Sequence, residues 1–325
     1  MKSIAAIGSS MLRAGNMLTL LLVAFALGGY SLQEARGSEL ALVVVLSTGG
    51  TIAGRGGSTT SLSEYKAGQI KGSELIEAVP EIKQYASVRA EQIVNLGSTN
   101  LTTAVWLKLA NRINEIFSKE PQVAGVVITH GTNTLEETAY FLNLTVKHDK
   151  PVVLVGAQRP ATAISADGPL NLLNAIRTAA SEEARGKGVL IVMNDEINGA
   201  RDVTKSNTYR VEAFRSGELG FLGYVDADRV RFYRTSTRRH TTRSEFDVST
   251  LSSLPKVEIL HSYLEAGTTP IKALGEAGVA GIVFAGTGSG SLSDPERAAV
   301  KAMPASVSGQ RPILVRTSRT GNGRV

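Results

Sequence analysis

The sequence predicts an α/β fold with a larger N-terminal domain, in which helices flank a mostly parallel sheet, and a smaller C-terminal α/β domain. Apolar runs without polar alternation, typical of strands buried on both faces, alternate along the chain with segments of helical apolar spacing. The alternation resumes after a polar stretch in the last third of the chain. A length of 325 residues with 42% hydrophobic content leaves room for two globular domains.

In the N-terminal part, four apolar runs are predicted to be strands and three amphipathic segments to be helices. The strands are 42–46, 123–128, 151–155 and 189–193, and the helices are 102–117, 135–146 and 169–180. Short alternating patterns around two glycines predict a hairpin within 218–233. The spacing of Thr134 and Glu137 has the form of a capping box that would start the helix 135–146.

We expect the chain to divide into four segments. They are a secretory signal at 1–37, the N-terminal domain at 38–233, a linker rich in Thr, Ser and Arg at 234–254, and the C-terminal domain at 255–325. The last domain contains strand-like runs at 257–260, 279–285 and 313–315. We expect it to be incomplete at Val325, because no helix follows to cover its last apolar strand.

The first segment has the layout of a signal peptide. Lys2 and Arg13 precede an apolar stretch, 17–27, which is shorter than the ~17 residues that a membrane span needs. This favours cleavage, and thus a periplasmic or secreted protein without a membrane contact after processing, over a single N-terminal anchor. The chain has no cysteine, which excludes disulfides and thiol chemistry. Removal of this segment leaves a small positive charge, which indicates solubility and no nucleic-acid partner.

Two threonines follow predicted strands directly. Thr51 lies in the turn 48–54 after the first strand, and Thr132 follows His130-Gly131 after the second. Ligands collect beyond the carboxyl ends of strands in open α/β sheets, so the two hydroxyls would meet in one crevice. A hydroxyl freed by flanking glycines is a candidate nucleophile or substrate holder. His130 at a strand end is more often a structural histidine than a base, and we leave it out of the site.

A threonine hydroxyl becomes a good nucleophile only when a neighbour takes its proton or stabilises the alkoxide. Tyr65 and Lys205 are the residues that could do so. Lys205 follows the predicted strand 189–193, so it would also stand at the carboxyl edge of the sheet. Burial there would lower its pKa and let it act on Thr132. Taken alone, a lysine is more often a solvated surface charge.

These motifs resemble the bacterial-type L-asparaginases, in particular the exported type II group. The stretch 48–54 is similar to the first signature of that family, and 128–138 is similar to the second. Gly97-Ser98, 156–160, 165–168 and 202–205 match further family blocks in the same order. The resemblance extends over almost all of 40–325.

The resemblance implies roles for individual residues. Thr51 would be the nucleophile and Tyr65 the residue that activates it, while Thr132 and Lys205 would form a second hydroxyl relay. Ser98 would bind the α-carboxylate of the substrate. The family reaction needs no metal and no organic cofactor: the threonine attacks the side-chain amide, ammonia leaves, and water hydrolyses the acyl-enzyme.

Three positions depart from the family pattern. Asn133 stands where many members carry an aspartate, which removes a charge pairing with the substrate ammonium. Thr99 stands where a glutamine is common, so the carboxylate pocket is altered. Ser289 occupies the place of an asparagine that reaches the site of a neighbouring subunit. The resemblance also implies a homotetramer with sites between subunits, and a second-domain glutamate of the family has no counterpart here.

Three functions are compatible with these residues. The first is an L-asparaginase, and the second is a glutaminase-asparaginase, whose pocket would be one methylene longer, a difference worth only ~1 to 3 kcal/mol. The third is a non-catalytic amino-acid-binding protein. The presence of Thr51, Tyr65, Thr132 and Lys205 speaks against a binding protein, because a binding protein needs no nucleophile.

Overall fold

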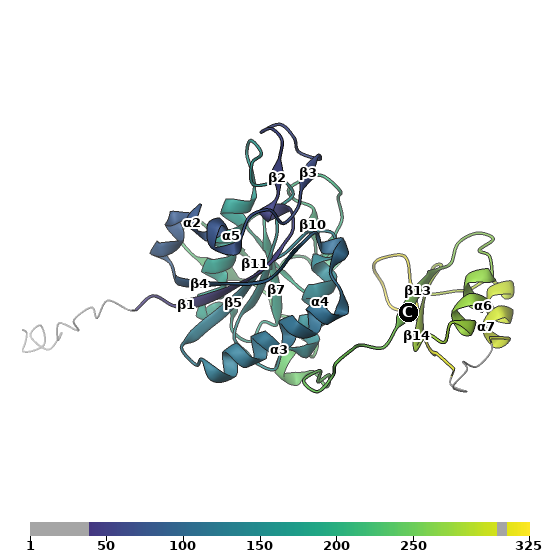
Figure 1. Ribbon diagram of the computed structural model, residues 1–325. Helices are drawn as coiled ribbons and strands as arrows, with labels where there is room; N and C mark the ends of the chain where they lie inside the picture. Colours follow the sequence, from purple (N-terminus) through teal and green to yellow (C-terminus); the bar gives the residue numbers. More distant parts are fainter. Residues whose placement is uncertain (1–38, 304–310) are drawn as a thin grey trace, which may run out of the picture. The chain divides into compact units, whose positions relative to one another are not determined.

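The computed structural model describes residues 39–303 and 311–325, and it confirms the α/β class (Figure 1). Its large sheet has eight strands in the order β12-β11-β8-β7-β6-β5-β1-β4, and a second sheet has the order β13-β14-β15. The predicted secretory signal, 1–37, lies outside the described residues. Among the described helices, none is both long enough and apolar enough to cross a membrane.

The large sheet contains every strand predicted for the N-terminal part. Its strands are β1 (Leu42–Gly49), β4 (Ser87–Leu96), β5 (Val123–Thr129), β6 (Val152–Val155), β7 (Val189–Met193), β8 (Glu196–Gly199), β11 (Gly223–Val225) and β12 (Val230–Phe232). The run from β4 through β7 is parallel, whereas β8, β11 and β12 are antiparallel. The predicted hairpin within 218–233 is therefore β11–β12.

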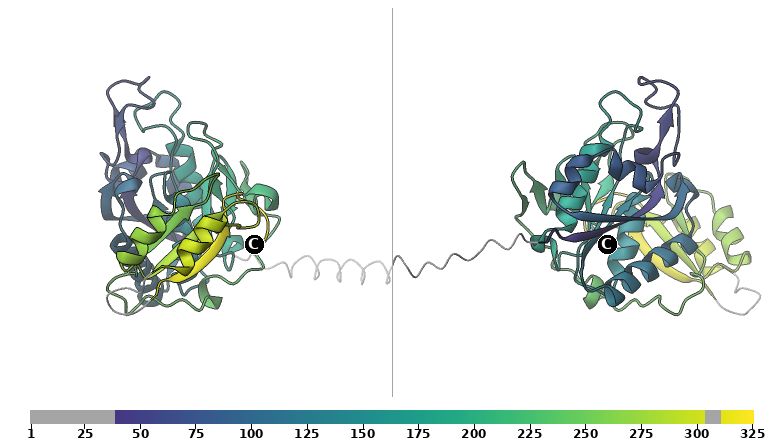
Figure 2. Two further views of the ribbon diagram at one scale, coloured as in Figure 1. Left: turned by 90° about the vertical axis from the view of Figure 1, so that its right-hand side faces the viewer. Right: turned by 60° about the vertical axis from the view of Figure 1, so that its left-hand side comes forward.

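Four helices cover the two faces of this sheet (Figure 1, Figure 2). They are α2 (Gly72–Glu77), α3 (Thr103–Lys119), α4 (Leu135–Thr145) and α5 (Gly168–Ala179). Alternate residues of β1 point to opposite faces: Val44 and Leu46 pack in the core with α3 and α4, whereas Val43 and Val45 pack with α2 and α5. Burial on both faces explains why β1 reads as an unbroken apolar run.

The order of strands places a topological switch point at β1. The chain passes from β1 to β4 on one side and then to β5 on the other side, so the connections that leave the carboxyl ends of β1 and β5 diverge. Crevices at such points are the usual ligand sites of open α/β sheets. Both predicted threonine turns lie at this position.

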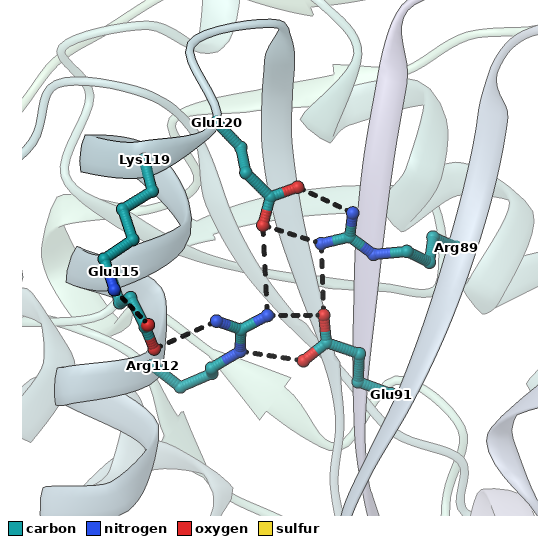
Figure 3. Close-up of polar contacts among 6 residues, drawn as sticks. All are labelled: Arg89, Glu91, Arg112, Glu115, Lys119 and Glu120. Carbon is teal, nitrogen blue, oxygen red and sulfur yellow. Dashed lines mark hydrogen bonds and ion pairs between the residues drawn. The ribbon is translucent and has the colours of Figure 1, made fainter.

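Strand β4 was not predicted, because it is an edge strand with a polar sequence. Arg89 and Glu91 on β4 join a network of charges with α3 and the residue that follows it (Figure 3). Arg89 makes a bidentate contact with Glu120, at 2.6 and 3.0 Å, and Arg112 makes one with Glu91, at 2.8 Å for both bonds. The hydrogen bonds from Arg112 hold the pKa of Glu91 below its usual range.

This network ties the edge of the sheet to α3. It extends along the helix through Glu115, which accepts hydrogen bonds from Arg112 at 3.0 Å and from Lys119 at 2.8 Å. Bidentate contacts within a network are the arrangement in which partly exposed charges stabilise a protein measurably. Charged side chains on an edge strand also disfavour pairing with a second chain.

One local prediction was wrong. Thr134 is the N-cap of α4, but its side chain does not cap the helix: its hydroxyl donates to the carbonyl of Ser98 at 3.0 Å, so no capping box forms with Glu137. Several residues of the segment 234–254, which we predict to be a linker, are buried. His240 is buried, and Val248 belongs to the core beneath α3 and α4.

The smaller sheet has three parallel strands, and two helices connect them. They are β13 (Val257–His261), α6 (Thr269–Glu276), β14 (Gly281–Gly286), α7 (Asp294–Lys301) and β15 (Ile313–Ser318). The side chains of Ile282 and Phe284 on β14 pack with Ile271 of α6 and Ala299 of α7 in a separate core. This confirms the predicted return of the α/β pattern after residue 254.

The remaining elements are short. They are the strands β2 (Arg55–Gly56), β3 (Tyr65–Lys66), β9 (Thr204–Lys205) and β10 (Phe214–Arg215), and the 3₁₀ turns η1 (Thr51–Ala53), η2 (Pro80–Gln84), η3 (Ser98–Asn100), η4 (Glu182–Ala184), η5 (Gly217–Leu219) and η6 (Thr241–Arg243). The four strands form two antiparallel pairs, β2–β3 and β9–β10, and each pair carries a candidate site residue.

Candidate active site

The turns that follow β1 and β5 are in direct contact. Gly50 precedes Thr51 and has φ of 85°, a conformation that favours glycine. A Cβ at this position would lie 2.3 Å from the backbone nitrogen of Gly131, the residue before Thr132. Only glycine fits there, and its absence of a side chain lets the two threonine turns pack backbone to backbone.

Thr51 is hydrogen-bonded to Tyr65. The distance between Thr51 Oγ1 and the Tyr65 hydroxyl is 2.6 Å, and Thr51 is only 6% exposed. Tyr65 lies on β3, which pairs with β2 to form the hairpin that projects beyond the sheet (Figure 1). Gly54 leaves room for the tyrosine ring, because a Cβ there would lie 2.9 Å from Tyr65 Cδ2.

Thr132 is hydrogen-bonded to Lys205. Lys205 Nζ donates to Thr132 Oγ1 at 2.8 Å and to Asn133 Oδ1 at 3.1 Å. Burial lowers the pKa of Lys205, while the carboxylate of Glu136 acts in the opposite direction. A lysine with a lowered pKa can exchange a proton with a neighbouring hydroxyl more readily than a solvated lysine.

Lys205 reaches this position by a route that the sequence did not predict. We expected it to follow β7 directly, but β8 folds back antiparallel to β7, with Gly199 opposite Leu190. The next residues return alongside α4: the Arg201 guanidinium donates to the Tyr140 hydroxyl at 2.9 Å, and the Thr204 hydroxyl donates to Glu136 at 2.9 Å. Lys205 thus lies beside Thr132 as expected, but it arrives there after β8 and not directly from the end of β7.

The other candidate residues fall into two groups. Ser98 is buried against the second threonine turn, where a Cβ on Gly131 would lie 2.8 Å from its hydroxyl oxygen. Asn133 and Thr99 are exposed. Ser289 is also exposed, in the turn after β14 that is closed by a bridge between residues 287 and 291.

A cavity of about 350 Å³ opens beside the Thr132–Lys205 pair. The residues that line it are all polar: Asn133, Glu136, Lys205, Ser206, Asn207 and Thr208. It is large enough for a ligand of amino-acid size, and its lining offers amide, hydroxyl, carboxylate and ammonium groups. One of these, Glu136, was not among the predicted site residues. The signal for it was its place in the second signature, 128–138, but only the neighbouring Glu137 received a role there, as the partner of Thr134 in a capping box.

His130 is a buried structural residue, in keeping with its omission from the predicted site. Trp106 Nε1 donates to Thr138 Oγ1 at 2.8 Å, and this hydroxyl lies 2.9 Å from His130 Nε2. The Thr138 hydrogen is thus free to donate to Nε2, so the imidazole proton sits on Nδ1 and donates to the Gly131 carbonyl at 2.7 Å. Full burial lowers the pKa of His130 to about 4.

We expect His130 to make stability depend on pH. Its pKa is depressed on folding, so the neutral ring stabilises the fold above about 6.5, and this contribution is lost as the pH falls toward about 4. The loss should reach ~3 kcal/mol in the free energy of unfolding. Urea unfolding at several pH values, with wild type and His130→Gln compared, measures it. Equal pH dependence of the two proteins would contradict the expectation.

Comparisons with known proteins find one family over most of the chain. The family model described as "Asparaginase, N-terminal" matches residues 42–238. The chain is 53% identical over 288 residues to L-asparaginase 2 of Bacillus subtilis, which covers 88% of this chain and 75% of that protein. It is 48% identical over 296 residues to a protein of Haemophilus influenzae named probable L-asparaginase periplasmic, with 91% and 82% covered.

A solved structure has the same fold. The crystal structure of a protein named probable cytoplasmic L-asparaginase, from Campylobacter jejuni, superposes with a TM-score of 0.82 at 48% identity, and the match covers 86% of this chain and 84% of that chain. Proteins named glutaminase-asparaginase also match the sequence.

Proposed function

Because the chain belongs to the asparaginase family, we propose that it is an L-asparaginase, which hydrolyses the side-chain amide of L-asparagine to L-aspartate and ammonia. One observation carries the proposal beyond family membership. Two threonine hydroxyls on contacting turns each have their own proton-exchanging partner, Tyr65 for Thr51 and Lys205 for Thr132. A binding protein would need neither pair.

In the first half of the proposed reaction, Thr51 Oγ1 attacks the side-chain amide carbon of asparagine. Its proton passes to the Tyr65 hydroxyl oxygen, which lies 2.6 Å away, while Tyr65 gives its own proton to the amide nitrogen that will leave. Backbone N–H groups of the turns stabilise the oxyanion that forms on the amide oxygen. The carbon–nitrogen bond then breaks, the leaving nitrogen keeps the proton from Tyr65, and ammonia departs from an ester between Thr51 and the aspartyl group.

In the second half, water attacks the ester carbonyl carbon. We assign the Thr132–Lys205 pair to this step and to polarising the scissile amide, because Lys205 Nζ is within 2.8 Å of the Thr132 hydroxyl. Lys205 in its neutral form takes the proton of Thr132, which in turn takes a proton from water. The Thr51 oxygen of the ester leaves with the proton that Lys205 took up, returned through Thr132, and aspartate is released. The reaction as proposed uses neither a metal nor an organic cofactor.

We assign substrate binding to Ser98, Thr99 and Asn133. Ser98 lies beside the second turn, where its hydroxyl can hold the substrate α-carboxylate. Thr99 and Asn133 are exposed beside it, on η3 and on the second turn. A carboxylate at 133 would pair with the substrate ammonium, whereas the amide of Asn133 offers only a neutral acceptor.

We therefore expect Asn133→Asp to lower the KM for asparagine by a few-fold, because a charge-assisted hydrogen bond is roughly twice as strong as a neutral one. Steady-state kinetics of the variant and wild type measure this effect. An unchanged KM would mean that position 133 does not touch the substrate amino group.

The proposal extends to organisation and location. We propose residues 38–233 and 255–325 as the two domains, and a homotetramer in which Ser289 approaches the site of a neighbouring subunit. The chain would be exported to the periplasm or secreted after cleavage of 1–37. The name of the Haemophilus influenzae relative supports export, whereas the Campylobacter jejuni protein is named as cytoplasmic.

Release of ammonia from L-asparagine and from L-glutamine, measured in parallel with the full chain, tests the function. We expect hydrolysis of asparagine with a higher kcat/KM than of glutamine. Comparable values for both amides would identify a glutaminase-asparaginase instead. Binding of asparagine without any release of ammonia would overturn the proposal in favour of a binding protein.

A further inference from the structure

Glu136 at the start of α4 binds two consecutive residues of β9. One carboxylate oxygen accepts the backbone N–H of Lys205, and the other accepts the Thr204 hydroxyl at 2.9 Å. A single side chain thus fixes both the backbone and a side chain of this strand. Because the backbone of Lys205 is held from this side, its ammonium group can extend to Thr132.

Among the residues that the structure describes, Glu136 is the negative charge that raises the pKa of Lys205. Its Nζ contacts Thr132 and Asn133, which are both neutral. β10 pairs with it through Phe214, and the neighbouring cavity adds Ser206, Asn207 and Thr208.

We propose that Glu136 is a positioning residue for the Thr132–Lys205 pair, which holds β9 against α4 and supplies the negative charge that a neutral Asn133 does not. The inference rests on the proposed function, since it assigns Lys205 a role in the reaction. It explains how this site keeps a carboxylate near Lys205 although position 133 is an amide.

A simpler interpretation is that Glu136 only stabilises α4. Acidic residues in the first turn of a helix interact favourably with its dipole. Glu137 should interact with the helix dipole in the same way as Glu136, because both glutamates lie in the first turn of α4. However, the hydrogen bonds that hold β9 come from Glu136 and not from Glu137. Glu137→Gln is therefore a matched control for Glu136→Gln.

The first experiment measures kcat/KM for asparagine against pH in wild type, Glu136→Gln and Glu137→Gln. Loss of the Glu136 charge favours neutral Lys205, so we expect the acidic limb of the Glu136→Gln profile to move to lower pH by roughly one unit. The Glu137→Gln profile should coincide with that of wild type. Coincidence of all three profiles, or equal shifts in both variants, would overturn the proposal.

Adding Asn133→Asp distinguishes the effect of a negative charge near Lys205 from the effect of the hydrogen bonds that hold β9. In the Glu136→Gln background it returns a carboxylate to the neighbourhood of Lys205 Nζ, so the acidic limb should move back toward that of wild type. In a Glu136→Ala background, β9 also loses its two hydrogen bonds, so we expect a lower kcat than in wild type, and the same change should not restore it. Equal rescue of both backgrounds would contradict the positioning role.

The second experiment does not depend on activity. Competitive acetylation with acetic anhydride, followed by peptide mass spectrometry, gives the pH midpoint at which Lys205 becomes reactive. We expect a lower midpoint in Glu136→Gln than in wild type and Glu137→Gln. An unchanged midpoint overturns the inference even if the enzyme is active, whereas a shifted midpoint in a chain that releases no ammonia refutes the proposed function alone.

Discussion

Replacement of Thr51 by alanine is expected to abolish asparagine hydrolysis, with a fall in kcat of roughly 10⁴-fold or more, because it removes the proposed nucleophile. The fold should persist, since the change deletes one hydroxyl and one methyl in a turn and leaves the sheet core untouched. Thr51→Ser should keep part of the activity through its remaining oxygen. Ammonia release, with circular dichroism as a check on folding, measures the effect.

Thr60→Ala is the control for this experiment. Thr60 lies exposed in the loop between β2 and β3, so the variant loses the same atoms from the segment that joins Thr51 to Tyr65 but keeps the Thr51 hydroxyl. We expect wild-type activity from it. Full activity in Thr51→Ala would mean that Thr132 or another group is the nucleophile.

The second large effect is expected for Lys205. Lys205→Met should lower kcat by roughly 10² to 10³-fold, because it removes the group that takes the proton of Thr132. Lys205→Arg should not restore activity, since a guanidinium stays protonated at working pH. In wild type, activity should rise with pH as Lys205 loses its proton, at a lower pH than for an ordinary lysine, because burial lowers its pKa.

Lys83→Met serves as the matched control, because Lys83 is exposed at the end of η2. We expect no change in its kinetics. If Lys205→Arg were as active as wild type, Lys205 would act as a fixed positive charge and not as a proton acceptor.

The strands that build the site were predictable because burial on both faces leaves a clear apolar run. β1 and β5 are the clearest cases, and their position in the sheet makes the residues after them neighbours. β4 was missed for the opposite reason. As an edge strand it carries Arg89 and Glu91 in the charge network of Figure 3, so its sequence lacks the apolar run on which the prediction depended.

The site residues were predicted less completely than the strands. Thr51 and Thr132 follow directly from the strand ends, but Lys205 arrives through β8 and the return along α4, which hydrophobic patterns do not reveal. Glu136 was missed because no local pattern gives it a partner: the capping-box prediction concerned only its neighbour Glu137. Its actual contacts are with residues almost seventy positions later in the chain, at sequence separations of 68 and 69.

The central claim is that Thr51 carries a covalent aspartyl group during turnover. Rapid quenching in acid after mixing with asparagine, followed by peptide mass spectrometry, tests it most directly. Thr132→Val should make the intermediate easier to detect, because hydrolysis of the ester would slow. We expect an aspartyl adduct on the peptide that contains Thr51, formed together with a burst of ammonia. An adduct on Thr132, or release of ammonia with no adduct at any time, would contradict the claim.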